Sequence, residues 1–351
     1  MPETEPGHAV SLIHRASLSA RPQIGATVSR LSPATANLQS EGAEVVPLPG
    51  VVITPQVEPG PAAKVTLYHF PTSICSQQVR LALAEKRVAW ESKIVNIGPE
   101  HEHFAPWYAK INPRLVVPTL EVDGSIVTDS ARIVRYIDEQ LEGPSLLPED
   151  PEARAEALAW MQRETELPMR ELGYVRSKGI TRWLQRYGLR QRRKQLTKLR
   201  KRYPELDDVY AAKLDEIAAL EGSINDRRAT TELIDRVEVT LDELEATLAD
   251  RKWLAGEHYS LADLVWTAVI AKLDHIGFAR SLSQHRRPRV HEWYTRLRER
   301  PSWDAMIRRL TAVQIIRFYG PAALKAFLIF WVLKWALVGG GLWLLKHLLS
   351  G

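Results

Sequence analysis

The chain has a single cysteine, Cys75, which is the first residue to consider for chemistry. A thiolate is a strong nucleophile, so a lone cysteine is either an inert packed side chain or a reactive thiol. One cysteine in 351 residues excludes an internal disulfide framework and a cysteine-based zinc site, and it favours a reducing compartment. His69, His101 and His103 are not spaced as a metal site. The sequence therefore predicts no metal centre and leaves both readings of Cys75 open.

Other reactive residue types occupy special places in the expected backbone. Ser73 puts a hydroxyl just ahead of a helix expected to start near Ser76, where it is either a functional donor or a capping group. Pro118 falls inside a strand pattern, where proline marks an edge, a bulge or a cis bond. Asp129 and Ser130 open another helix. A helix N-terminus attracts anions, although an aspartate there also simply favours the helix dipole.

The elements that would position these residues follow one another in the order β-α-β-α-β-β-α. Alternating or apolar runs predict the strands, and helical periodicity predicts the helices. Asp123-Gly124 is a strong two-residue hairpin signal. Strands are expected at 64–68, 90–97, 116–122 and 126–128, and helices at 76–86, 101–110 and 129–141. Residues 63–142 are therefore expected to form a small four-stranded α/β domain.

A linker with three prolines, 142–151, leads into an expected all-helical domain over 151–312. Ser260 and Asp263 have the spacing of a capping box, in which each side chain accepts from the backbone amide of the other. The following run, 264–273, is apolar on all sides, which predicts a buried helix.

A charged insert, 176–250, lies between the first helix of this domain, expected at 152–172, and the capped helix. Its first part, 176–202, carries twelve lysines and arginines and no acid, whereas 205–250 is strongly acidic. Both parts show helical spacing, which predicts a long helical hairpin whose charges neutralise each other. A membrane-surface or partner patch is the alternative, followed by a nucleic-acid site. No nucleic-acid motif is present, and the net charge of +5 is modest for this length.

The N-terminal residues 1–62 are expected to be a disordered tail. They are rich in proline, serine, alanine and threonine, they lack lysine, and they show no sustained apolar periodicity. Such a segment cannot bury enough surface to offset the entropy of ordering it. The acid-free stretch 8–40 resembles an organelle transit peptide only faintly.

The C-terminal segment 322–349 is expected to be a transmembrane anchor helix. Its core, 326–345, holds one charge, Lys334, and would span about 30 Å as a helix. An amphipathic helix lying in the membrane interface is the alternative. Positive charge ahead of the segment favours a soluble body that faces the cytoplasm. The sequence does not identify the membrane.

The chain resembles the glutathione S-transferase family from about residue 64 to residue 311. The stretches that carry the resemblance are 73–86 (SICSQQVRLALAEK), 117–120 (VPTL), Asp129-Ser130, and 253–256 (WLAG) running into the capping box at 260–263. In this order they are fairly specific for a fold with a thioredoxin-like N-terminal domain and an all-α C-terminal domain. The insert and the expected C-terminal anchor are similar to the tail-anchored ganglioside-induced differentiation-associated branch of that family.

The resemblance implies a glutathione site in the N-terminal domain. Ser73 would stabilise the thiolate of bound glutathione, with Cys75 as the alternative catalytic residue. A cis bond between Val117 and Pro118 would expose the Val117 backbone to the cysteinyl part of glutathione. Asp129 and Ser130 would receive its γ-glutamyl carboxylate at the helix N-terminus.

Two classes of function are therefore expected. The first is a membrane-anchored glutathione S-transferase that conjugates glutathione to a small electrophile, or exchanges thiols through Cys75. The second is a non-enzymatic, membrane-tethered adaptor that binds partners or anionic lipid through its charged insert. A homodimer is one possible oligomeric state, and no nucleic acid partner is expected.

The anchor is testable directly. Full-length protein should sediment with membranes and resist extraction with alkaline carbonate, because the apolar run 326–345 is long enough to span the hydrocarbon core. A chain ending at Tyr319 should remain in the supernatant. Release of the full-length protein by high salt or alkaline carbonate would place the segment at the membrane surface instead.

Overall fold

The structure is a computed structural model that describes residues 63–98, 100–177, 179–307, 311–318, 320, 321, 324 and 331. The predicted tail, 1–62, lies outside the described residues, and so does the predicted anchor, 322–349, apart from Leu324 and Trp331. Within the described stretches, no helix has the length and apolar character needed to cross a membrane.

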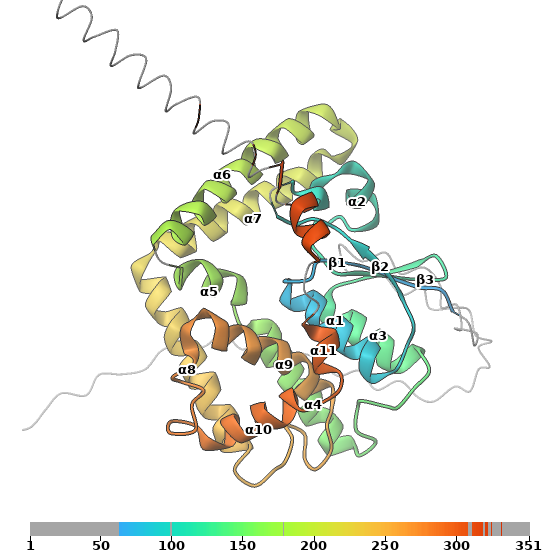
Figure 1. Cartoon of the computed structure of the whole chain (residues 1–351), viewed down its shortest axis with the longest axis vertical. Helices are drawn as coiled ribbons and strands as arrows, with labels where there is room; N and C mark the ends of the chain where they lie inside the picture. Colours follow the sequence, from blue (N-terminus) through green and yellow to red (C-terminus); the bar gives the residue numbers. More distant parts are fainter. Residues whose placement is uncertain are drawn as a thin grey trace, which may run out of the picture. The chain divides into compact units, whose positions relative to one another are not determined.

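The N-terminal domain has the predicted thioredoxin-like architecture (Figure 1). Its sheet has the strand order β2-β1-β3-β4, with β1 parallel to β2 and antiparallel to β3. The tight Asp123-Gly124 turn joins β3 to β4, and both residues have positive φ angles. The elements are β1 (Val65–His69), α1 (Ile74–Glu85), β2 (Glu91–Ile94), α2 (Pro106–Ile111), β3 (Thr119–Val122), β4 (Ser125–Thr128) and α3 (Ser130–Gln140).

Alternation along the strands separates the two faces of the sheet. Val65 and Leu67 of β1 belong to the apolar core that contains residues of α1 and α3. Tyr68 points the other way and packs with Tyr108 of α2, at a ring-centroid distance of 6.3 Å. Strand β1 is therefore buried on both faces, which fixes its register and the path of the loop that follows it.

The helical domain has eight α-helices within the described residues. They are α4 (Pro151–Glu166), α5 (Met169–Val175), α6 (Gly179–Arg202), α7 (Asp207–Asn225), α8 (Arg227–Thr247), α9 (Leu261–Leu273), α10 (Pro288–Arg298) and α11 (Trp303–Met306). The capping box at the start of α9 is formed as predicted, with the Ser260 amide 3.0 Å from Asp263 Oδ2. Almost every residue of α9 is buried, as the all-round apolar pattern predicts.

Several expected elements differ from the observed ones. The helix expected over 101–110 is a 3-10 turn, Glu102–Phe104, followed by α2, and the acidic arm of the expected hairpin, 205–250, divides into α7 and α8 at Asp226.

Proline explains two further differences. The single helix expected over 152–172 is wrong, because the chain divides into α4 and α5 at Leu167-Pro168. Proline disfavours a helical conformation in the preceding residue and has no N–H to donate. The strand expected over 116–122 begins only at Thr119, so Pro118 lies just before β3 and outside the ladder.

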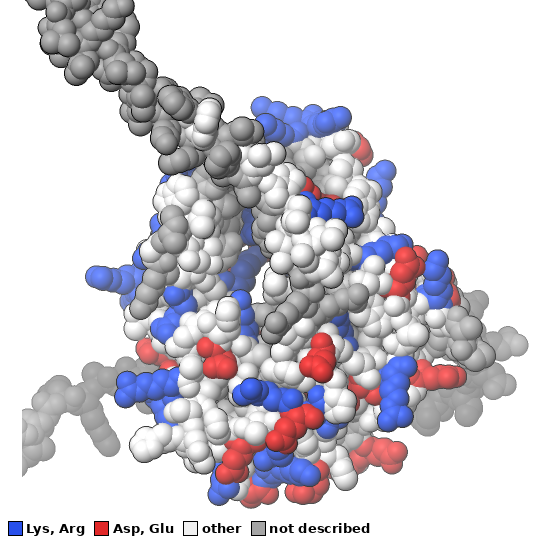
Figure 2. Space-filling view, viewed as in Figure 1, with Lys and Arg blue, Asp and Glu red and all other residues white. Residues whose placement is uncertain are grey.

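The charged insert folds as helices α6 to α8, and α6 and α7 pack side by side (Figure 1). Their interface is apolar, with Leu189 and Leu196 buried against residues of α7. Ion pairs join the basic and acidic parts at Arg193–Glu221 (3.0 Å) and Arg200–Asp207 (2.6 Å). In the view of Figure 2, acidic and basic side chains are mixed over the lower part, where Figure 1 places α8 and α10.

Arg80 of α1 joins the two domains through a buried guanidinium group. It is only 1% exposed and donates to the carbonyls of Pro71, Ala305 and Met306 at 2.9, 3.1 and 2.6 Å. A further bond, of 3.1 Å, reaches Nδ1 of His69 at the end of β1. The loop after β1 is therefore fixed to α11 by one side chain.

Replacing Arg80 with methionine should lower the free energy of unfolding by about 3 kcal/mol. The substitution removes charge-assisted hydrogen bonds and leaves buried carbonyl groups unsatisfied. Equilibrium denaturation measures the change. Arg154→Met, at an exposed position of α4, is the matched control and should cost less than about 0.5 kcal/mol. Equal losses for the two variants would contradict the role assigned to Arg80.

Candidate functional site

The candidate site begins at the N-terminus of α1, where Ser73 is the N-cap residue. The Ser73 hydroxyl accepts from the Ser76 amide at 3.3 Å, and its own amide donates to the Phe70 carbonyl at 3.1 Å. Ser76 Oγ accepts in turn from the Phe70 amide at 3.3 Å. These bonds hold the loop rigidly and leave the Ser73 hydroxyl proton able to donate to an acceptor in front of the helix. Capping and function are therefore compatible at this residue.

Cys75 lies in the first turn of α1, and its thiol forms a hydrogen bond with the Ser130 side chain at the start of α3. Part of Cys75 reaches solvent. The protein packed around it nevertheless withdraws the thiol from water, and this desolvation raises the pKa of Cys75. The Ser130 bond opposes that rise, whereas the charges of Glu164 and Asp129 add to it. Cys75 is therefore a protonated thiol at neutral pH.

Asp129 and Ser130 sit where the resemblance implies, at the N-terminus of α3. Asp129 is the N-cap and has a φ angle of +76°, a conformation that non-glycine residues rarely adopt. Its carboxylate is held by Arg114 at 2.8 Å and by the Arg132 amide at 3.4 Å. Strained residues that are held in this way cluster at functional sites. The first turn of α3 thus brings backbone amide groups and the Ser130 hydroxyl close to Cys75.

The peptide bond between Val117 and Pro118 is cis, as the resemblance implies. The preceding carbonyl, of Val116, accepts from the Tyr108 hydroxyl at 2.7 Å and from Asn112 Nδ2 at 2.8 Å. Among the described residues, no hydrogen bond engages the backbone N–H or C=O of Val117. Both groups therefore remain available to pair with an extended ligand.

Glu164 of α4 is a functional candidate that sequence reasoning missed. Gln78 of α1 donates to Glu164 at 2.8 Å, and the charge of Glu164 acts on Cys75. Burial raises the pKa of Glu164 to about 7; the Gln78 hydrogen bond opposes this, and the Asp129 charge adds to it. Nothing in the sequence distinguishes Glu164 from the other acids of α4, because its role arises from packing between the domains.

The C-terminal residues 312–318 form a helical segment next to the same site. Phe318 is 7% exposed and belongs to the apolar cluster that contains Phe70 and Val117. Its ring centroid lies 6.2 Å from that of Phe70. Phe318 therefore packs on the apolar side of the loops that carry Ser73 and the cis bond.

Tyr68 and the histidines His69, His101 and His103 contribute to packing in this structure. The Tyr68 hydroxyl donates to Glu121 at 2.8 Å on the α2 face of the sheet, and desolvation by burial raises the pKa of Tyr68. Desolvation and the charge of Arg192 lower the pKa of His101 to about 4. Across the described residues, no three histidine, cysteine or acidic side chains are grouped so that they could hold a metal ion.

The structure brings the predicted site residues to one region. The N-termini of α1 and α3 meet at the Cys75–Ser130 contact, and the apolar cluster links Phe70, next to Ser73, with Val117. A thioredoxin-like domain with a cis-proline loop, joined to a helical domain, defines a class of two-domain thiol-binding proteins. The residues at the two helix N-termini suit an anionic, thiol-containing ligand.

Comparison with known proteins assigns the family. The glutathione S-transferase N-terminal domain matches residues 72–140, and the glutathione S-transferase C-terminal domain matches residues 227–296. The tetrachloro-p-hydroquinone reductive dehalogenase of Sphingobium chlorophenolicum is 33% identical over 241 residues, which cover 69% of this chain and 94% of that protein. The chain belongs to the glutathione S-transferase family. Members of this family are enzymes that use glutathione as co-substrate.

Two further relatives extend the similarity. Ganglioside-induced differentiation-associated protein 1-like 1 of Mus musculus is 26% identical over 293 residues, which cover 75% of this chain and 79% of that protein. The crystal structure of the beta-etherase LigF from Sphingobium sp. strain SYK-6 superposes with a TM-score of 0.55 at 25% identity. That match covers 69% of this chain and 98% of the other.

The raised pKa of Glu164 predicts a dependence of stability on pH. The unfolded carboxyl has a pKa of about 4.3, so between this value and about 7 the folded state keeps a proton that the unfolded state has lost. Stability should therefore fall as pH rises through this range. Glu164→Gln, which can still accept from Gln78, should be about 1–2 kcal/mol more stable than the parent at pH 8, with little difference near pH 4.5.

The test measures the free energy of unfolding of the parent and of Glu164→Gln by denaturation across this pH range. Glu166→Gln, at an exposed position of the same helix, is the control and should leave the pH profile unchanged. A parent profile that rises from pH 5 to pH 8 because of Glu164 would show that its folded pKa is depressed instead.

Proposed function

We propose that this chain conjugates the thiolate of glutathione to a small electrophile while anchored to a membrane by its C-terminal segment. The observation that carries the proposal is the meeting of two helix N-termini beside the cis bond. In this proposal the N-terminus at Ser73 holds the thiolate, and the N-terminus at Ser130 holds the carboxylate. Glutathione carries both groups, so one ligand satisfies both helix ends.

Ser73 is the residue assigned to thiolate stabilisation. A thiol has a reference pKa near 8.5, so little thiolate exists at neutral pH without help. The Ser73 hydroxyl and the amides of the first turn of α1 provide donors for the anion in a fixed geometry. Because these donors favour the anion, they lower the pKa of the bound thiol and hold the nucleophile in place.

The electrophile would bind beside the sulfur, next to residues of the helical domain. The similar protein from Sphingobium chlorophenolicum is named for tetrachloro-p-hydroquinone, which makes halogenated aromatic compounds a reasonable first class to test. In such a conjugation the thiolate attacks the ring carbon, the carbon–sulfur bond forms, and halide leaves with the electron pair of the carbon–halogen bond.

Thiol–disulfide exchange through Cys75 is a second candidate, favoured by the partial exposure of this thiol and its contact with Ser130. In that reaction the Cys75 thiolate would attack glutathione disulfide, forming a mixed disulfide and releasing glutathione. The raised pKa of Cys75 disfavours this route at neutral pH, because the thiolate is the attacking species.

The membrane anchor and a cytoplasmic soluble body remain proposals that rest on the apolar run 326–345 and the positive charge before it. The non-enzymatic adaptor remains the alternative function. It is supported by the surface-exposed insert of α6 to α8 and by similarity to the ganglioside-induced differentiation-associated relative.

The transferase reading is tested with full-length protein in mild detergent. It should bind glutathione in calorimetry and conjugate a chlorinated dinitrobenzene. Ser73→Ala should lower the rate by roughly ten- to hundredfold and barely change the affinity, since one hydrogen bond to a charged sulfur is worth about 1.5–3 kcal/mol. Ser130→Ala should instead weaken glutathione binding.

Controls separate chemistry from folding. Ser73→Ala also removes a helix cap worth about 1 kcal/mol, so thermal unfolding must show that the variant is folded at the assay temperature. Ser223→Ala, at an exposed position of α7, should behave like the parent. Absence of glutathione binding at millimolar concentration would reject the enzyme and leave the adaptor. Loss of turnover in Cys75→Ala alone would identify Cys75 as the nucleophile.

A further inference from the structure

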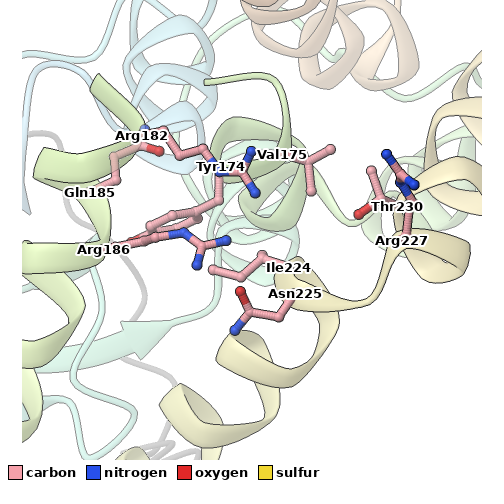
Figure 3. Close-up of a pocket in the computed structure, with 9 residues that line it drawn as sticks. All are labelled: Tyr174, Val175, Arg182, Gln185, Arg186, Ile224, Asn225, Arg227 and Thr230. Atoms are coloured by element: carbon pink, nitrogen blue, oxygen red, sulfur yellow. The ribbon is translucent and has the colours of Figure 1, made fainter. Parts of the chain in front are cut away.

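A cavity of about 440 Å³ opens between α5, α6 and the junction of α7 with α8 (Figure 3). It shares no residue with the candidate glutathione site, and it lies within the charged insert and the helix that precedes it. Its volume falls in the range of about 300–1,000 Å³ that small-molecule sites occupy. The cavity is therefore large enough for a ligand of its own.

The charged groups of the lining are all positive. They are the guanidinium groups of Arg182, Arg186 and Arg227. Among the described residues, none of the three has a carboxylate within ion-pair distance. The acid nearest in sequence, Asp226, caps α8 by accepting from the amides of Arg228 and Ala229. The positive charge of the cavity is thus not neutralised by the fold.

Neutral groups of the lining add selectivity. The Tyr174 hydroxyl accepts from Arg192 at 3.1 Å, so its own proton can be donated to an anion. Gln185 Nε2 donates to the Gly173 carbonyl at 3.4 Å, which holds this side chain at the edge of the cavity. Figure 3 shows Arg186 directed toward Ile224 and Asn225, so charged and apolar surfaces lie next to each other.

We propose that this cavity binds a phosphomonoester anion. A phosphomonoester carries a charge of about −1.5 to −2 at neutral pH, and the planar fork of arginine matches phosphate oxygens in pairs. Arg182 and Arg186 hold the phosphate and Tyr174 donates to it, while Arg227, on the other side of the cavity in Figure 3, adds positive charge. The organic part lies against Val175 and Ile224.

The same phosphate chemistry is found in soluble esters and in the headgroup of phosphatidic acid, so the experiment has two arms. In the first, calorimetry measures binding of glycerol 3-phosphate to the full-length protein in neutral detergent. In the second, flotation compares phosphatidylcholine vesicles with and without phosphatidic acid. The basic residues around the anchor also attract anionic vesicles, but equally in the parent and in every variant, so the part of the difference that depends on the cavity residues reports on the phosphate site.

The key variant carries Arg182→Gln, Arg186→Gln and Arg227→Gln. Its matched control carries Arg190→Gln, Lys198→Gln and Arg202→Gln, which remove the same charge from exposed positions of α6 outside the cavity. The cavity variant should lose at least tenfold in affinity for glycerol 3-phosphate, and the control should lose less than threefold. Tyr174→Phe should weaken binding without changing charge.

Each outcome either supports or overturns the proposed phosphate site. Cavity-dependent binding of glycerol 3-phosphate without preference for phosphatidic acid supports a soluble ligand, and a cavity-dependent preference for phosphatidic acid supports a lipid. No binding of either by the parent protein, or equal losses in the cavity variant and the control, overturns the proposal. Glutathione binding should be unchanged in every variant, so failure here is distinct from failure of the proposed transferase.

Discussion

The buried guanidinium group of Arg80 is the interaction on which the rest of the structure depends. Arginine has donors only, so Nδ1 of His69 must accept from it, and Nε2–H of the same ring is left to donate to Ser92 Oγ at 2.8 Å. One charged side chain thereby sets the end of β1, the carbonyl of Pro71 and the backbone of α11. The loop that carries Ser73 is rigid because both of its flanks are bonded to buried groups.

Helix α1 makes further buried hydrogen bonds along the interface between the two domains. Gln78 bonds to Glu164 and to the carbonyl of Val265, while Glu85 accepts from Arg300 and from Ser302 of the other domain. Buried polar groups are tolerated there because they have partners. The same helix supplies the N-terminus at the proposed glutathione site. The geometry of that proposed site and the packing of the domains therefore depend on the same set of hydrogen bonds.

The insert is stabilised mainly by apolar packing rather than by buried polar groups. Its helices α6 and α7 bury an apolar stripe against each other, so they need no ligand to fold. Pairs such as Arg193–Glu221 are partly exposed, and each is worth at most about 1 kcal/mol. Charge in the insert therefore contributes less to stability than apolar packing does. It is instead available for binding, most clearly in the cavity lined by Arg182, Arg186 and Arg227.

Short-range patterns determined much of this protein. The order of strands and helices along the α/β unit, the Asp123-Gly124 turn, the capping box at Ser260 and the buried α9 follow from propensities and periodicities within about ten residues. The resemblance carried by short motifs added the positions of Ser73, Val117 and Ser130. Tertiary structure alone decided which of these meet: the Cys75–Ser130 contact, the pairing of Gln78 with Glu164 across 86 residues, and the partners of Arg80 more than 220 residues away. Such contacts, and the pKa shifts of Cys75 and Glu164, depend on desolvation by packed neighbours, which no local sequence pattern specifies.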